Sequence, residues 1–268
     1  DTDSRRLTIG VNDVTYAPST STPDTDSPAA PGAAAPLHAG VAPSDATALP
    51  PYCPRMLRPS TLALLLNAPT DHLLTHLRGT DLHTDADAPT ATLPFDPSVV
   101  PPRTVGDIAH AVLTTLSTHV ATTLHPPRTD TVLAALATPS LDAHLQQLPD
   151  AARSGVRRFI LETVLPQFHR SACYEKLQRA TRVYTEKPLP GRLRVAGVEH
   201  EFDGHADVVV TYPDGSWDII EFKLAFRPMA PELYERYQLQ VATYANLLRQ
   251  YVTTPVRTSI EVFGRTVR

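Results

Sequence analysis

The spacing of apolar positions divides the chain into a helical part and a strand-rich part. Apolar residues recur every three or four positions in segments long enough for amphipathic helices, which predicts helices over 59–67, 104–123, 130–147, 150–180 and 231–250. Short runs rich in β-branched residues and bounded by turn residues predict strands over 181–187, 191–202, 206–212, 216–223 and 257–263. This order predicts an α/β or α+β fold, in which a mixed central sheet is flanked by helices and carries an inserted helical region.

Two of the predicted strands bring carboxylates together. The strands 206–212 and 216–223 flank Pro213–Gly215, a Pro-Asp-Gly turn signal, so they should pair as a hairpin. In an antiparallel pair, a residue that enters one strand lies across from a residue that leaves the other. Asp207 and Glu221 occupy these two positions and should therefore converge.

The residue two positions after Glu221 adds a cation to this pair. Because side chains alternate along a strand, Glu221 and Lys223 point to the same face. Carboxylates suit Mg²⁺ or Mn²⁺, and Lys223 could orient or deprotonate an attacking water or offset charge on phosphorus. A plain cross-strand ion pair explains these three residues equally well, so they do not decide the function alone.

The predicted helix after the hairpin favours a polar site. Pro231 suits the first helical turn, and the inner face of the helix reads Leu233, Tyr237, Gln240, Tyr244 and Leu248. An amide buried without partners costs about 1–3 kcal/mol, so Gln240 within this apolar stripe should face a polar site. The two tyrosines are also explained by packing.

At this point the chain resembles the PD-(D/E)XK nuclease superfamily, and in particular its RecB-like branch. That branch carries Gly-x-x-Asp, Asp/Glu-x-Lys and Gln-x-x-x-Tyr, which match Gly204–Asp207, Glu221–Lys223 and Gln240–Tyr244 in the same order. The segment Gly106–His110 fits the Gly-x-x-x-His of the branch, and Arg58–Leu62 looks like its usual lead-in.

The resemblance covers roughly residues 55 to 251. It implies a restriction-endonuclease-like core and an Mg²⁺- or Mn²⁺-dependent deoxyribonuclease of DNA repair or recombination, whose product carries a 5′-phosphate. It also implies roles for matching residues: metal ligands His110, Asp207 and Glu221, a water-assisting Lys223, and positioning residues Gln240 and Tyr244. By spacing alone, His110 falls just beyond an apolar stripe, where a surface histidine is more typical than a ligand.

Other polar residues fit the site less well. His200 and His205 lie five positions apart on a predicted strand and should point to opposite faces. We expect His200 to be exposed and His205 to lie at the rim of the site. Glu186 is expected to be a solvent-facing strand residue and not a third carboxylate.

The cysteines exclude one cofactor that occurs in relatives of this branch. An iron–sulfur cluster needs four cysteine thiolates, and this chain has only Cys53 and Cys173. Two isolated thiols form no disulfide framework and fit a reducing cytoplasm. No run is long and apolar enough to span a membrane.

The first part of the chain differs in composition from the rest. Residues 15–51 are rich in Pro, Ala, Ser, Thr and Asp, so they cannot bury enough surface to offset their ordering entropy. We expect residues 1–54 to be a linker or disordered tail and residues 55–268 to be the nuclease domain. Residues 6–11 could end a preceding domain or add a strand to this one. The missing Met and the resemblance suggest a piece of a longer protein, tethered to a helicase.

Charge says little about a partner. The formal net charge is −4, and residues 1–50 account for it, so residues 51–268 are balanced. A neutral domain does not indicate DNA binding as a basic one would. Arg153, Arg157 and Arg158 could follow a DNA backbone or form a solvated helix face.

Three functions remain open on these grounds. The leading hypothesis is a metal-dependent DNA nuclease. The second is a catalytically silent DNA-binding or docking module of a helicase complex, although such domains usually lose the acidic pair or the lysine. The third is an unrelated, metal-free α/β binding domain, which would require Gln240 and His110 to lie far from Glu221.

Overall fold

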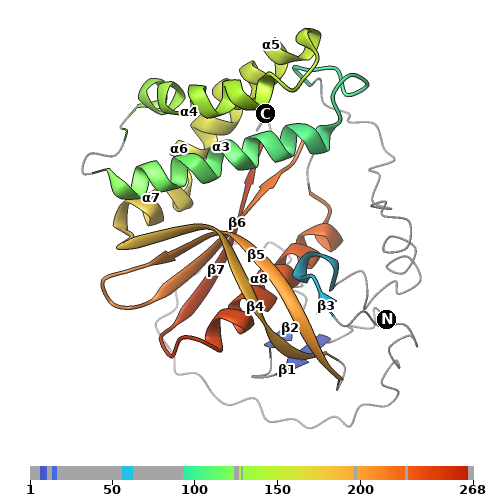
Figure 1. Ribbon diagram of the computed structural model, residues 1–268, viewed down its shortest axis with the longest axis vertical. Helices are drawn as coiled ribbons and strands as arrows, with labels where there is room; N and C mark the ends of the chain where they lie inside the picture. Colours follow the sequence, from blue (N-terminus) through green and yellow to red (C-terminus); the bar gives the residue numbers. More distant parts are fainter. Residues whose placement is uncertain are drawn as a thin grey trace, which may run out of the picture.

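A mixed β-sheet runs through the part of the chain that the computed structural model describes (Figure 1). The structure describes residues 7–10, 14–16, 56–62, 93–123, 127, 129–195, 198–226 and 229–264. The strands are β1 (Leu7–Gly10), β2 (Val14–Tyr16), β3 (Met56–Leu57), β4 (Arg182–Val195), β5 (Val198–Thr211), β6 (Trp217–Leu224) and β7 (Val256–Phe263). They are ordered β2-β1-β4-β5-β6-β7, and β3 pairs with β5.

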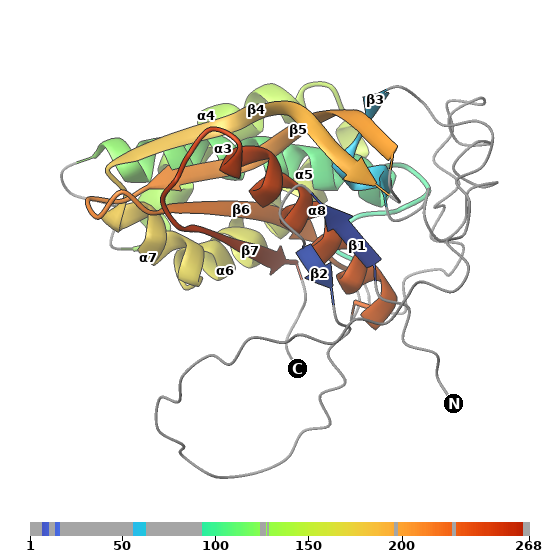
Figure 2. The ribbon, with the colours of Figure 1, turned by 90° about the horizontal axis from the view of Figure 1, so that it is seen from below.

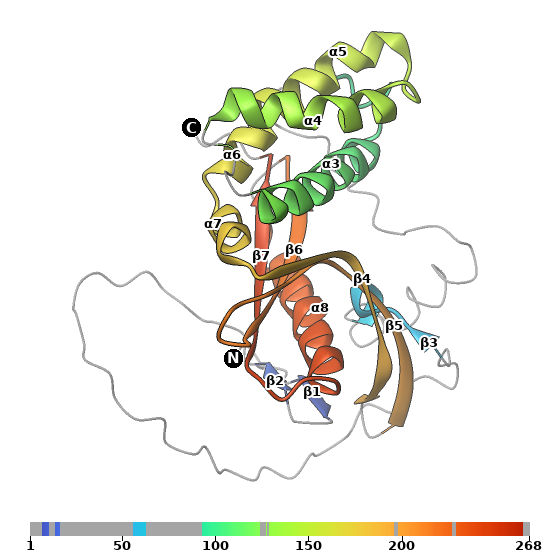
Figure 3. The same cartoon turned by 60° about the vertical axis from the view of Figure 1, so that its left-hand side comes forward.

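Helices cover both faces of this sheet (Figures 1 and 3). One face carries α3 (Pro102–Thr122), α4 (Asp130–Leu145), α5 (Asp150–Phe159), the π-helix η1 (Ile160–Val164), α6 (Leu165–His169) and α7 (Ala172–Arg179). The other face carries α8 (Pro231–Arg249). The predicted α/β architecture with an inserted helical region is therefore confirmed.

The alternation of side chains along β5 explains the two cores. Val208 and Val210 pack into the core beneath α3, whereas Val209 packs into the core beneath α8. This is the period of two that a strand imposes, and it explains why a continuous run of valines is buried. The central strands thus form a rigid base for the residues that follow them.

Strand register leaves one stretch of β5 without a neighbour on one edge. β6 pairs antiparallel with β5 from Val208 to Thr211, and β3 pairs parallel with β5 at Glu201 and Phe202. Between them, no other described strand pairs with this edge of β5. β4 and β5 curve away together from β6 along this stretch (Figure 3).

The predicted division into strands 181–187 and 191–202 is wrong. β4 continues to Val195 and pairs with β5 along its length, so the chain reverses between Val195 and Val198. Pro188 and Pro190 occupy alternate positions of β4, where β5 is its only described neighbour. A proline is tolerated in a strand when its missing N–H faces an unpaired edge.

The predicted helix 150–180 is divided into several segments. A π turn at Ile160–Val164 precedes Pro166, which cannot donate the hydrogen bond that a continuous α-helix needs. A second break follows at Arg170, and the Ser171 side chain accepts from the Tyr174 amide to cap α7. Local chemistry at these two positions therefore overrides the helical period.

Residues near the start of the chain extend the sheet. β1 pairs antiparallel with β4 at Val195 and Arg194, and both β1 and β2 lie on the side of α8 (Figure 2). This fits the expectation that residues 6–11 add a strand to the domain. Residues 63–67 of the first predicted helix, Cys53 and most of the predicted tail lie outside the described residues. Within them, no helix is long and apolar enough to cross a bilayer.

Candidate active site

Asp207 and Glu221 meet where β5 and β6 separate. The last paired residues are Val208 and Ile220, so the two carboxylates take the next position of the same register. The amide of Phe222 donates to Asp207 Oδ2 at 2.7 Å and holds that carboxylate across the gap. Both side chains are buried. The predicted convergence is observed, although Asp207 lies inside a strand and not at its start.

A chain of hydrogen bonds connects Glu221 to α8. Glu221 Oε1 accepts from Lys223 Nζ at 2.6 Å and from Gln240 Nε2 at 2.7 Å. Gln240 Nε2 also lies 3.0 Å from the hydroxyl of Tyr244. The polar position in the apolar stripe of α8 thus faces the carboxylate, as predicted. The separation of Gln240 from Glu221 that an unrelated binding domain would require is therefore not observed.

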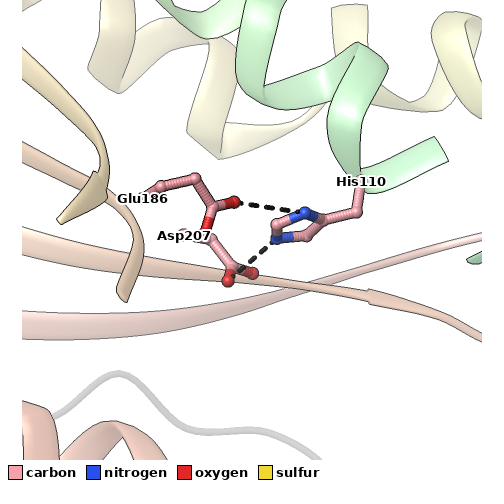
Figure 4. A group of neighbouring side chains, drawn as sticks. All are labelled: His110, Glu186 and Asp207. Atoms are coloured by element: carbon pink, nitrogen blue, oxygen red, sulfur yellow. Dashed lines mark ion pairs between the residues drawn. The ribbon is translucent and has the colours of Figure 1, made fainter. Parts of the chain in front are cut away.

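His110 of α3 lies between two carboxylates (Figure 4). Its Nε2 is 2.9 Å from Asp207 Oδ1, and its Nδ1 is 3.3 Å from Glu186 Oε1. One possible ligand atom from each of these three residues lies within 4.8 Å of the others. The histidine that spacing placed at the edge of the apolar face therefore points into the site.

Glu186 was expected to face solvent, and the structure brings it to this group. Its side chain is 53% exposed, yet its carboxylate faces His110. Glu186 stands opposite Asp207 in the β4–β5 register, between the pairs Thr185–Val208 and Lys187–Ala206. One predicted strand ended at 187 and another began at 191, so the continuous register of β4 with β5 was missed. That register is the signal that could have identified Glu186.

The backbone at Glu186 is strained. Its φ of 48° lies in the left-handed region, which costs a residue with a Cβ about 1–2 kcal/mol. Glu186 is also left out of the pairs of the β4–β5 ladder. Such strain persists only where the surroundings impose it, and it concentrates at functional sites.

Burial and like charge shift the titration of the site. Burial, with the neighbouring Asp207 carboxylate, raises the pKa of Glu221 to about 7. Burial alone would lower the pKa of Lys223, but the Glu221 and Asp207 carboxylates outweigh it and raise that pKa. The pKa of His110 is raised in the same way, since Asp207 and Glu186 outweigh its burial.

The donor set fits a divalent cation. Glu221 Oε2 is buried and has no hydrogen-bond partner, an arrangement that costs free energy unless something binds there. A carboxylate with raised pKa beside a second carboxylate gains from a cation that neutralises both. Carboxylate oxygens with one imidazole suit Mn²⁺ or Mg²⁺.

The remaining predicted residues have different fates. His200 is buried and not exposed, because the alternation of β5 places it on the same face as Phe202, while His205 is exposed. Arg153 and Arg157 form ion pairs with Asp150 and Asp142, which favours a structural role for them. Cys173 is buried and free.

Comparison with known proteins identifies the family of the chain. A search of curated proteins finds no significant similarity. The sequence profile of the PD-(D/E)XK nuclease superfamily matches residues 57–263, a span that contains His110, Glu186, Asp207, Glu221, Lys223, Gln240 and Tyr244 and nearly all of the sheet. The mixed sheet flanked by helices agrees with a restriction-endonuclease-like fold, and the chain belongs to the PD-(D/E)XK nuclease superfamily.

Proposed function

We propose that this protein is a metal-dependent DNA nuclease of the RecB-like branch, which hydrolyses phosphodiester bonds with Mg²⁺ or Mn²⁺. The observation that carries this proposal is the meeting of His110, Glu186 and Asp207 beside the Glu221–Lys223 pair. Membership of the nuclease superfamily supports the reaction class.

The metal would be held by the side chains that surround the gap between β5 and β6. Asp207 and His110 supply an oxygen and a nitrogen that already lie 2.9 Å apart. Glu221 offers the oxygen that lacks a partner, and Glu186 offers a further carboxylate from β4. When bound, the cation polarises the scissile phosphate and lowers the pKa of a bound water.

Lys223 acts in this scheme as a hydrogen-bond donor. Its raised pKa keeps it protonated at neutral pH, so the ammonium can orient the attacking water and stabilise negative charge that develops on the phosphate. Its contact with Glu221 fixes the ammonium beside the metal position. This favours the orienting role over the deprotonating role that the sequence also allowed.

Gln240 and Tyr244 hold the site in shape. Gln240 donates to the oxygen of Glu221 that also accepts from Lys223, which turns the other oxygen toward the metal position. Tyr244 lies 3.0 Å from the same amide nitrogen. These two residues of α8 therefore position Glu221 and need not touch the reacting atoms.

The biological setting is part of the proposal. A nuclease of this branch would serve DNA repair or recombination, with a helicase fused or associated. The alternative of a silent docking module receives no support from the site, since Asp207, Glu221 and Lys223 are all present, Lys223 donates to Glu221, and Asp207 accepts from the backbone amide between them.

Cleavage of end-labelled single- and double-stranded DNA tests this function. The assay compares Mg²⁺, Mn²⁺ and EDTA for the wild type, Asp207→Asn and the matched control Asp107→Asn, an exposed residue on the helix that carries His110. We expect cleavage by wild type and control only with metal, and none by Asp207→Asn. Absence of cleavage by the wild type in every condition would overturn the proposal.

A further inference from the structure

The open edge of β5 has a site at each end. Asp207 lies at the end where β6 begins to pair, and Asp203 lies at the end where β3 stops. At the second end is a hollow of about 350 Å³, lined by Arg58, Pro59, Ser60, Asp203, His205 and Tyr244. Small-molecule sites span roughly 300–1,000 Å³, so this hollow suits one nucleotide and not a duplex.

The hollow and the metal position are neighbours. Asp203, His205 and Asp207 follow one another at alternate positions of β5, and His205 lies about 6.7 Å along the strand from Asp207. Tyr244 belongs to both places, because it is one of the residues that line the hollow and its hydroxyl contacts Gln240. A polynucleotide at the metal position would therefore reach the hollow within about one nucleotide.

The charge of the lining fits a phosphate. Arg58 is exposed and makes no ion pair with another described residue, so its guanidinium is available for the bidentate contact that arginine makes with phosphate. The acidic residue of the lining is partly engaged, since Asp203 Oδ1 lies 3.7 Å from His205 Nδ1. The exposed ring of His205 offers a surface against which a base or sugar can pack.

We propose that this hollow is a nucleotide subsite for single-stranded DNA, in which Arg58 contacts the phosphate adjacent to the scissile one. The subsite rests on the proposed function for its ligand. It explains why the sheet is left open between β3 and β6, because a paired strand there would fill the path of the DNA. An internal phosphate and a 5′-terminal phosphate offer Arg58 the same chemistry.

Binding of a fluorescein-labelled oligothymidylate, measured by anisotropy in EDTA, tests the subsite without needing catalysis. Each phosphate contact adds about 0.7 to the slope of log K against log salt for a single strand. We expect Arg58→Gln to lower this slope by about 0.7 and affinity by roughly tenfold, whereas Arg58→Lys keeps the slope. Arg158→Gln, which removes an exposed arginine from α5, is the matched control and should change neither.

Two further arms complete the design. Oligonucleotides with a 5′-phosphate or a 5′-hydroxyl distinguish an internal phosphate contact from a terminal one. If Arg58 contacts an internal phosphate, Arg58→Gln should weaken binding of both oligonucleotides equally. If it contacts the terminal phosphate, only the phosphorylated strand should bind more weakly. If Arg58→Gln keeps the wild-type slope, or the wild type does not bind the strand, the subsite is wrong. If binding changes as expected but the wild type never cleaves, the subsite stands and the proposed catalysis fails.

Discussion

The ring of Tyr244 lies directly against the α-carbon of Gly204. A Cβ at this position would lie 3.0 Å from Tyr244 Cε1 and 3.1 Å from its Cδ1, so tightly that the ring would have to shift by a few tenths of an ångström. Glycine at this position therefore leaves room for the ring of Tyr244, whose hydroxyl accepts from Gln240 one turn earlier on α8. This close approach gives a physical reason for the glycine that precedes Asp207 by three positions.

Gly204→Ala should consequently impair the site through Tyr244. The displaced ring would shift Gln240 and with it Glu221, and such a shift of a few tenths of an ångström should lower kcat by about tenfold. The control is Gly106→Ala, because a Cβ at Gly106 in α3 meets nothing within 4 Å. That variant should keep activity and gain about 0.5–1 kcal/mol of unfolding free energy. Cleavage rates and urea denaturation of both variants test this reasoning. It is wrong if Gly204→Ala keeps a higher cleavage rate and a higher free energy of unfolding than Gly106→Ala.

Two substitutions of Glu186 should affect metal binding equally but stability differently. Glu186→Ala and Glu186→Gly both remove the carboxylate beside His110, so both should bind Mn²⁺ more weakly in calorimetric titrations. Glycine also adopts a φ of 48° without strain. The free energy of unfolding, measured by urea denaturation, should therefore be about 1 kcal/mol higher for Glu186→Gly than for Glu186→Ala. Wild-type Mn²⁺ affinity in both variants would exclude Glu186 from the ligand set.

The buried Glu221 predicts how the metal-free protein responds to pH. Its pKa is raised from 4.5 to about 7, chiefly by burial and then by Asp207, so the folded state holds this proton more tightly than the unfolded chain. The resulting stabilisation is fully present below about pH 4.5 and is lost as pH rises through 7, a decline of up to about 3 kcal/mol. Urea denaturation in EDTA from pH 5 to 8 should reveal it.

Glu221→Gln isolates this contribution, because the amide carries no charge. The variant should be inactive, and in EDTA at pH 8 it should be more stable than the wild type. The stability difference should shrink toward pH 5, where the wild-type carboxyl is protonated. His110 also has a raised pKa and loses stabilisation in the same direction, but it is present in both proteins. If the stabilities of the two proteins changed with pH in parallel, the pH dependence would not come from the Glu221 carboxyl.

Local sequence patterns were sufficient to predict the meeting of Asp207 with Glu221 and the orientation of Gln240. The β-branched runs around Pro213–Gly215 predicted the hairpin that joins Asp207 to Glu221. The amide of Gln240 within an apolar stripe predicted that α8 turns this face toward a polar group. Both inferences depend on residues close together in the sequence, where periodicity and turn chemistry determine the geometry.

The rest depends on contacts between distant segments. Pro188 and Pro190 signal a turn locally, and only the position of β4 beside β5 explains why they are tolerated in a strand. The predicted break within β4 concealed the fact that Glu186 stands opposite Asp207. The open stretch of β5 lies between its pairs with β6 and its pairs with β3, a strand from far earlier in the chain that pairs at Glu201 and Phe202. No periodicity within one segment could predict that arrangement.

The most direct test compares hydrolysis of single-stranded DNA by the wild type, Lys223→Met and Lys187→Met, with Mn²⁺ binding measured for each. Lys187 is the matched control, since its ammonium lies 5.2 Å over the ring of Tyr184 and does not contact Glu221. We predict that Lys223→Met loses about 10²–10³-fold in kcat while it still binds Mn²⁺, and that Lys187→Met cleaves at the wild-type rate. Cleavage by Lys223→Met at the wild-type rate would contradict the assignment of this site as the catalytic centre.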